Sequence, residues 1–263
     1  MENEAAAFLK ISDRSKPRNE GLTSMHDAFL PLREVEDLLE VAADYIDYGK
    51  LVHIGLLQQS LPPMWLEKKI DLYHEKGVRV YPGGVPFQVA ALQDQVQEYF
   101  QWVLAKGFDA VEIADDAMPV SIEERQWTDS IKMAVDMGLE VHTELGKKHP
   151  SRPLDLDEAC TTAQRDLSLG VSKVVIERAE LDTFMHSNDV SPLLMFIKTV
   201  GLQHLLFEPG PFGWPDVHRW CFQTFGKNVN LGNIEKDEVI YIEYSRRGIS
   251  RFVDYDYFNE DEK

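Results

Sequence analysis

Four apolar segments of this chain each run into a glutamate, and the four glutamates recur at a nearly constant interval. They are Glu112, Glu144, Glu177 and Glu208, and successive members are 32, 33 and 31 residues apart. One strand, one helix and two short loops need an interval of this length, and that unit repeats in a parallel α/β barrel. The period therefore predicts a single (β/α)8 TIM barrel. An open doubly wound sheet is the alternative fold, although no glycine-rich nucleotide motif supports it.

The rest of the sequence supplies the other elements that such a barrel needs. Four further strand candidates cover residues 21–26, 45–53, 78–82 and 228–232. Apolar residues at helical spacing predict helices over residues 32–43, 61–76 and 89–105. Glycines that follow helical segments are expected to end them in the left-handed conformation, namely Gly77, Gly107, Gly138, Gly170 and Gly201.

The composition and the charge restrict the class of protein. The 263 residues suit one domain over residues 1–263, with residues 1–15 and 252–263 expected to be peripheral or frayed. A net charge of −18 argues against nucleic acid or an anionic membrane as a partner. Both a small anionic substrate and a homo-oligomer remain compatible with this net charge.

The chain shows no sign of a membrane or secretory segment. No basic-then-apolar leader and no apolar run near the roughly 20 residues of a membrane span is present. A cytoplasmic location is therefore expected. The two cysteines, Cys160 and Cys221, lack metal-ligand spacing and are interpreted as reduced thiols.

Polar residues at the carboxyl ends of barrel strands form the active-site face, and the four glutamates fall there. Two carboxylates about 6 Å apart repel by roughly 3 kcal/mol at an effective dielectric near 20, so a cation, protons or basic neighbours must relieve the charge. Oxygen ligands without cysteine or clustered histidine favour Mg²⁺. The predicted metal ligands are Glu112, Glu144, Glu177 and Glu208. A single glutamate at a strand end is also common as a surface residue.

Other residues at the same strand ends are candidates for binding substrate. They are Asp27, Lys50, Gly83, Gly84, Lys148, Arg178 and Asn230. His26, His53 and His142 could approach the mouth, but structural or solvent roles are favoured for each of them. Lys147 and Lys148 fit either a phosphate clamp or proton donor, or plain surface charge. The pair Arg246-Arg247 fits either a phosphate contact or the surface.

Seven motifs occur in order over residues 16–250. They are K-P-R at 16–18 followed by G-L-T, E-D-L-L-E-V-A-A-D-Y-I-D-Y-G-K at 36–50, Y-P-G-G at 81–84, F-D-A-V-E-I at 108–113, E-L-G-K-K at 144–148, V-N-L-G-N-I at 229–234 and R-R-G at 246–248. Together they resemble the phosphosulfolactate synthase family, and they also resemble divergent plant heat-stress-associated relatives of that family. The resemblance implies a TIM barrel and a lyase that adds sulfite to phosphoenolpyruvate with Mg²⁺.

The resemblance also implies roles for individual residues. Mg²⁺ held by Glu112, Glu144 and Glu177 would stabilise charge on the substrate carboxylate, and Lys147 would protonate the adjacent carbon. Glu144 is the second residue expected to be essential for catalysis. The residues expected to offset phosphate and sulfite charge are Lys16, Arg18, Lys50 and Arg178.

Several positions depart from the family pattern near the expected anion site. Gln88 stands in place of an acid, Arg178 is moved by one position, and P-G-P-F-G-W-P at 209–215 replaces a lysine and paired glutamines. Two alternatives to sulfite addition therefore stay open. One is the same metal-assisted step with another nucleophile or acceptor, and the other is a non-catalytic or stress-associated barrel that binds a ligand or partner.

Overall fold

The computed structural model describes residues 11, 14–56 and 61–251. The predicted frayed ends, 1–15 and 252–263, lie outside these residues except for Ile11, Arg14 and Ser15. Within the described part of the chain, no helix is long and apolar enough to cross a membrane.

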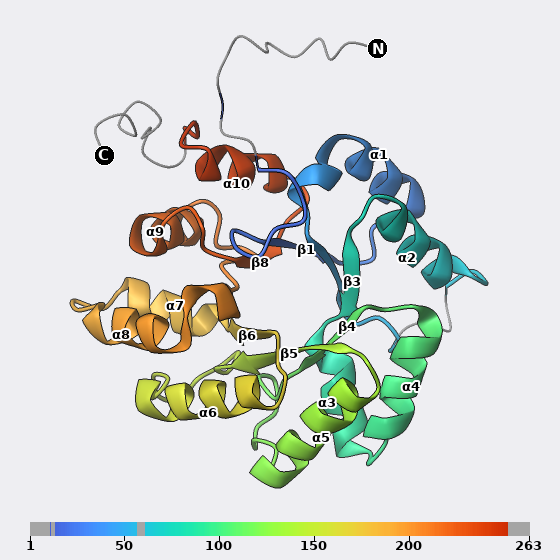
Figure 1. Ribbon diagram of the computed structural model, residues 1–263, viewed down its shortest axis with the longest axis horizontal. Coiled ribbons are helices and arrows are strands. Elements are labelled where there is room, and N and C mark those ends of the chain that lie inside the picture. Colours follow the sequence, from blue (N-terminus) through green and yellow to red (C-terminus); the bar gives the residue numbers. More distant parts are fainter. Residues whose placement is uncertain (1–10, 12–13, 57–60, 252–263) are drawn as a thin grey trace.

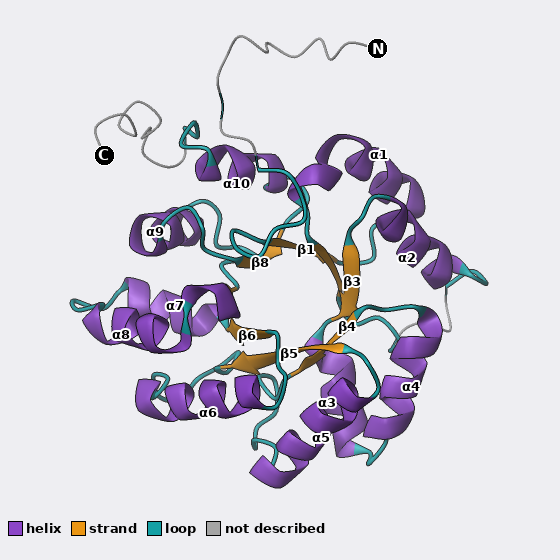
Figure 2. Cartoon of the chain, in the orientation of Figure 1, coloured by secondary structure: helices purple, strands orange, loops and turns teal. Residues whose placement is uncertain are grey.

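Eight parallel strands form a ring that the helices surround (Figures 1 and 2). The strands are β1 Thr23–Asp27, β2 Tyr48–Leu51, β3 Arg79–Pro82, β4 Ala110–Ile113, β5 Glu140–Leu145, β6 Lys173–Ile176, β7 Leu205–Phe207 and β8 Leu231–Ile234. The sheet order is β3-β2-β1-β8-β7-β6-β5-β4, so each strand lies beside its neighbours in sequence and β1 pairs with β8. The predicted (β/α)8 barrel is confirmed, and the open doubly wound alternative is excluded.

The ends of this sheet, β3 and β4, meet through Asp109, the residue before β4. The backbone amide of Asp109 donates to the carbonyl of Val80 at 3.0 Å. The Asp109 carboxylate accepts a hydrogen bond from the Val80 amide at 2.7 Å. Where the ring closes, the Asp109 carboxylate therefore accepts the kind of hydrogen bond that a main-chain carbonyl accepts elsewhere in the sheet.

The helices alternate with the strands and cover the outside of the ring. Their bounds are α1 Leu32–Ala42, α2 Trp65–Glu75, α3 Gly84–Leu92, α4 Val96–Lys106, α5 Glu124–Asp136, α6 Leu156–Ser168, α7 Arg178–Met185, α8 Ser191–Val200, α9 Asp216–Phe225 and α10 Val239–Arg246. Short 3₁₀ turns, η1 Ala43–Tyr45 and η3 Leu202–His204, precede β2 and β7. The five glycines expected at helix ends all have positive φ, from 67° to 102°, although Gly201, with ψ 122°, lies outside the left-handed helical conformation that was predicted.

Three predicted elements need correction. The helix expected over residues 89–105 is two helices, α3 and α4, because Asp94 has φ 54° and the Gln95 amide turns back to the Ala90 carbonyl. The helix expected from residue 61 begins at Trp65, since Met64 has φ 58°. The eighth strand lies at Leu231–Ile234 rather than at 228–232.

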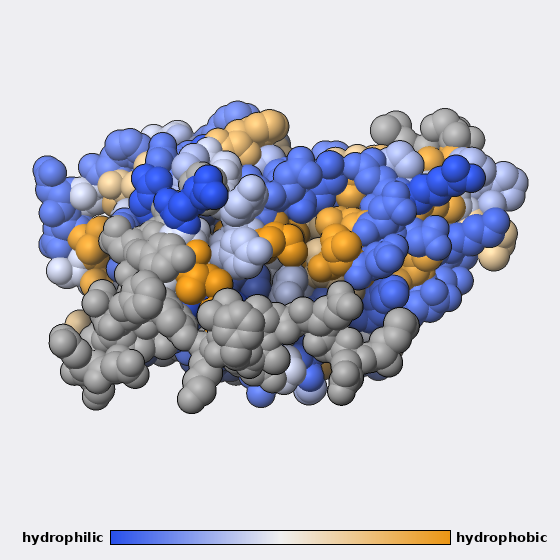
Figure 3. Space-filling model, turned by 90° about the horizontal axis from the view of Figure 1, so that it is seen from above, coloured by the Kyte–Doolittle hydropathy of each residue, from blue (hydrophilic) through white to orange (hydrophobic). Residues whose placement is uncertain are grey.

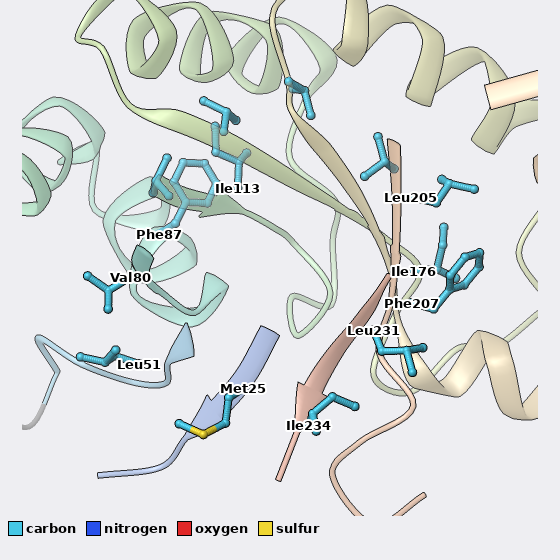
Figure 4. Packing of buried hydrophobic residues seen from close by; sticks show 14 of the residues in the cluster. Met25, Leu51, Val80, Phe87, Ile113, Ile176, Leu205, Phe207, Leu231 and Ile234 are labelled. Atoms are coloured by element: carbon cyan, nitrogen blue, oxygen red, sulfur yellow. The ribbon is translucent and has the colours of Figure 1, made fainter. Parts of the chain in front are cut away.

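Side chains that alternate along each strand point either to the helices or into the barrel. The outward set, which includes Met25, Val80, Ile113, Ile176 and Phe207, forms the main hydrophobic core (Figure 4). The inward set at the amino ends includes Tyr48, Tyr81 and His142, whose rings pack edge to face from three strands. The outer surface seen in Figure 3 is mainly hydrophilic, with scattered apolar groups.

Glu140 ties several elements together at the amino ends of the strands. It accepts hydrogen bonds from Tyr48 at 2.7 Å and Ser172 at 2.6 Å, and it pairs with Arg79 at 2.7 Å. Burial acts to raise the pKa of Glu140, but His142, Ser172 and Arg79 outweigh it and hold that pKa well below its usual range. The charged form of Glu140 therefore stabilises the fold.

Replacement of Glu140 by glutamine is expected to change how stability depends on pH. A depressed folded pKa gives stability that is present above the unfolded value, 4.5, and is lost as the pH falls below it. Glu140→Gln should lower the free energy of unfolding at pH 7 by about 1–3 kcal/mol and flatten its decline at acid pH. Urea unfolding between pH 7 and pH 3 measures both effects, with Glu98→Gln on an exposed helix face as control. An unchanged acid limb would contradict the role of Glu140.

Candidate active site

A cavity of about 550 Å³ opens at the carboxyl ends of the strands. Most of the predicted site residues line it: Lys50, Gly83, Gly84, Glu112, Glu144, Lys148, Glu177 and Arg178. Glu112, Glu144, Glu177 and Glu208 are all buried, and each occupies an inward position at or just after the end of its strand. The sequence period thus reflects equivalent places in four consecutive units.

Three carboxylates gather closely enough to share one cation. Asp116, Glu144 and Glu177 each offer an oxygen, and these atoms lie within 4.8 Å of one another. Glu144 Oε1 is buried and has no hydrogen-bond partner. An unsatisfied buried oxygen in an all-oxygen donor set fits a hard divalent cation such as Mg²⁺. Glu144 and Glu177, two of the four predicted metal ligands, therefore lie in the candidate metal centre.

The sequence analysis missed Asp116, the third member of this cluster. Asp116 follows β4 in the pair Asp115-Asp116, and the Gln88 side-chain amide donates to its carboxylate. Its backbone carbonyl accepts from the Lys148 amide at 3.0 Å, which joins the β4 and β5 loops. The acidic pair after the strand was the available signal, but only the loop conformation decides which acid faces inward.

Glu112 and Glu208, the other two predicted metal ligands, lie in a separate group around Lys50. Lys50 Nζ lies 2.9 Å from Glu112 Oε2 and 2.7 Å from Glu208 Oε1. Glu112 Oε1 also accepts the Gly84 amide at 2.7 Å, and Glu208 accepts from Asn233. Glu112 Oε2 makes no hydrogen bond, but its ion pair with Lys50 and the other three contacts lie at the oxygens that a metal would need.

The contact between the Gly84 amide and Glu112 requires a glycine at position 84. A Cβ atom at Gly84 would lie 2.6 Å from Ala114 Cβ and 2.9 Å from Glu112 Oε1. Glycine therefore lets the start of α3 approach β4 closely enough for the amide to reach Glu112.

Lys148 reaches the three-carboxylate cluster, whereas Lys147 points elsewhere. Lys148 Nζ lies 2.9 Å from Asp116 Oδ2 and 3.8 Å from Glu144 Oε1, and it also pairs with Glu177. Lys147 Nζ contacts Asp115, at 2.6 Å from Oδ1, and lines a neighbouring cavity. Lys148 therefore lines the main cavity, whereas Lys147, the predicted proton donor, does not.

Burial and mutual repulsion set the protonation of these acids. Burial, followed by the charges of Asp116, Glu208 and Glu112, raises the pKa of Glu144 well above its usual value. Burial also acts to raise the pKa of Glu177, but a hydrogen bond with Glu144 and the charge of Lys148 lower it overall. Burial raises the pKa of Glu208 to about 7 although Lys50 opposes the shift.

Four residues predicted to bind substrate lie outside the cavity lining. Lys16 reaches the Gly77 carbonyl at 3.4 Å, and Arg18 forms two hydrogen bonds with Asp47. Both contacts lie at the amino ends of β2 and β3, opposite the mouth. Lys16 and Arg18 were predicted as substrate-binding residues from their charge and their motif. Their segment precedes β1 and therefore packs at the amino ends of the strands.

The other two, Asp27 and Asn230, serve the packing of the barrel. Asp27 faces α2, where it accepts from Lys69 at 2.6 Å and Tyr73 at 2.8 Å. Asn230 bonds to Leu22 and Leu205 at the amino end of β8. The buried Arg246 likewise donates to backbone carbonyls, including that of Leu22 at 2.9 Å, and does not line the cavity.

Two of the histidines considered from sequence do line the cavity. His26 bonds to Glu235 at 2.9 Å, and burial, followed by the charge of Lys50, lowers its pKa to about 4. His53 lies at the rim with φ 53°. Asn233, His149 and Asp182 also line the cavity, although they were not among the predicted site residues.

Comparison with known proteins identifies the family. The profile described as (2R)-phospho-3-sulfolactate synthase (ComA) matches residues 12–251. The chain belongs to the phosphosulfolactate synthase family.

Phosphosulfolactate synthase of Methanocaldococcus jannaschii is 35% identical over 239 residues, which cover 87% of this chain and 92% of that protein. The Methanothermobacter thermautotrophicus protein is 31% identical over 259 residues, covering 92% and 94%. The Bacillus subtilis protein is 26% identical over 246 residues, covering 89% and 92%.

Solved structures of other enzymes share the fold of this phosphosulfolactate synthase family member. Phosphonopyruvate hydrolase in complex with oxalate and Mg²⁺ has a TM-score of 0.54 at 11% identity, with 83% of this chain and 77% of that chain covered. The YdjI aldolase of Escherichia coli has a TM-score of 0.52 at 10% identity, with 93% and 91% covered. At such low identity these similarities concern the barrel alone.

Substitutions in the two carboxylate groups should separate their roles in cation binding. Asp116→Asn is expected to weaken Mn²⁺ binding by at least about tenfold because it removes a charged oxygen from the cluster. Glu112→Gln should have a clearly smaller effect, since Glu112 contacts Lys50 and Gly84. Loss of the free Mn²⁺ signal in electron paramagnetic resonance measures the affinity, and circular dichroism checks folding. Equal losses in both variants would contradict the separation.

Proposed function

We propose that this chain is a Mg²⁺-dependent lyase that joins sulfite to phosphoenolpyruvate or to a closely related enol acid. The observation that carries the proposal is the cluster of Asp116, Glu144 and Glu177 with Lys148 at the barrel mouth. Family membership supports the same reaction. A cavity of about 550 Å³ is large enough for a small organic acid.

The proposed reaction forms one C–S bond and consumes one proton. The sulfite lone pair attacks the methylene carbon, the double-bond electrons move toward the carbon that carries the phosphate, and that carbon then takes up a proton. A divalent cation held by Asp116, Glu144 and Glu177 would stabilise the negative charge that develops on the substrate carboxylate.

The residues of the chain have distinct parts in this proposal. Lys148 donates the proton, because its side chain lines the cavity whereas the Lys147 ammonium is held by Asp115. Lys50 holds Glu112 and Glu208 in place and adds positive charge beside the substrate. Arg178 also lines the cavity and offers a further cation for an anionic group.

The two adjacent lysines provide a matched test of this assignment. With Mg²⁺, phosphoenolpyruvate and sulfite, the wild-type protein is expected to form the C–S product, detectable by phosphorus nuclear magnetic resonance. Lys148→Ala should lower kcat by about 10²–10⁴-fold, as expected for loss of a general acid, and Lys147→Ala should not. Glu144→Gln should abolish turnover. Folded wild-type protein that forms no product would refute sulfite addition to phosphoenolpyruvate.

The charge of the cavity favours one variation, an enol acid that carries less negative charge. Lys50 contacts two glutamates, Lys148 contacts the cluster, and Arg178 contacts the Pro211 carbonyl and Asp182. The adjoining wall is Gly210, Pro211 and the 91%-exposed Phe212, which offers no charge to a phosphate.

A comparison of substrates distinguishes phosphoenolpyruvate from a less charged acid as the preferred substrate. If the apolar wall sets specificity, an unphosphorylated 2-substituted acrylate is expected to give a higher kcat/KM with sulfite than phosphoenolpyruvate does. The Glu144→Gln protein corrects for the uncatalysed addition. A kcat/KM that is higher for phosphoenolpyruvate would exclude the variation and leave the main proposal in place.

A further inference from the structure

Lys148 and a divalent cation would contact the same three carboxylates. The lysine ammonium lies 2.9 Å from Asp116 Oδ2, contacts Glu177, and is 3.8 Å from Glu144 Oε1. These are the three carboxylates whose oxygens lie within 4.8 Å of one another. Two positive charges cannot share so small a cluster without strong repulsion. A cation bound there therefore requires the ammonium to move.

The attachment of Lys148 allows such a movement. Its backbone amide is fixed by a 3.0 Å hydrogen bond to the Asp116 carbonyl, so the residue stays at the edge of the cluster. Its side chain is 39% exposed and lines the open cavity. Lys50 differs in this respect, since its side chain is only 6% exposed and is clamped between Glu112 and Glu208. Of these two lysines, Lys148 has room to turn.

We propose that Lys148 is a displaceable counter-ion that couples cation binding to the placement of the proton donor. The ammonium balances Asp116, Glu144 and Glu177, and a divalent cation that takes these oxygens drives it into the cavity, toward the substrate. Cation binding and the positioning of Lys148 are then one event. The inference rests on the metal centre of the proposed function and adds a positioning step that the reaction itself does not require.

Coupling of this kind predicts that removal of the lysine charge tightens cation binding. Lys148→Met keeps the length of the side chain but leaves nothing to displace, so its Kd for Mn²⁺ is expected to fall by at least about fivefold, within the usual range of coupling between sites. Without added cation the same variant should have a lower Tm than the wild type, because the carboxylates have lost their partner. Mn²⁺ should reverse this difference.

Mn²⁺ titration by electron paramagnetic resonance and thermal unfolding with and without Mn²⁺ test both effects. Lys147→Met is the matched control, since its lysine contacts Asp115, and it should keep the wild-type Kd. Lys148→Gln, a polar neutral variant, repeats the test should the methionine variant misfold. Unchanged or weaker Mn²⁺ binding in the folded Lys148 variants would overturn the inference while leaving the proposed function intact. Absence of saturable Mn²⁺ binding in the wild type and all variants would instead refute the metal centre.

Discussion

The mouth of this barrel depends on the neutralisation of five buried carboxylates by two lysines. Lys50 contacts Glu112 and Glu208, and Lys148 contacts the cluster of Asp116, Glu144 and Glu177. Carboxylates that close together would otherwise repel one another or bind protons. The raised pKa of Glu144, which follows from burial and its acidic neighbours, shows that this repulsion is only partly relieved. A divalent cation would relieve it further.

The two groups of carboxylates differ in the contacts that their oxygens make. The group around Lys50 has its oxygens occupied by Lys50, the Gly84 amide and Asn233, so it holds the start of α3 and the end of β8 in place. In the cluster beside Lys148, Glu144 Oε1 makes no hydrogen bond and lies 3.8 Å from the Lys148 ammonium, and the cluster faces the open cavity. In the proposed reaction, the group around Lys50 would hold the neighbouring cluster within tight geometric limits.

The predictions from sequence succeeded where they depended on periodicity and were less successful where they depended on loops. The interval between the glutamates and the glycines after the helices predicted the barrel, and β4, β5, β6 and β7 end where the period expects. Residue type alone could not tell that Asp27 faces α2, or that Lys16 and Arg18 lie at the amino ends of the strands. The path of the chain before β1 and the pleat of that strand decide those positions.

The sequence by itself determined the barrel, its active-site end and its family, because alternation of strand and helix and the spacing of apolar residues are local properties that repeat along the chain. Only the tertiary structure decided which carboxylates meet. Glu112 and Glu208 are 96 residues apart but converge on Lys50, and Asp116 joins Glu144 and Glu177 because the β4 loop turns inward. Adjacent lysines receive different partners for the same reason: the β5 loop directs Lys148 into the mouth and Lys147 toward Asp115.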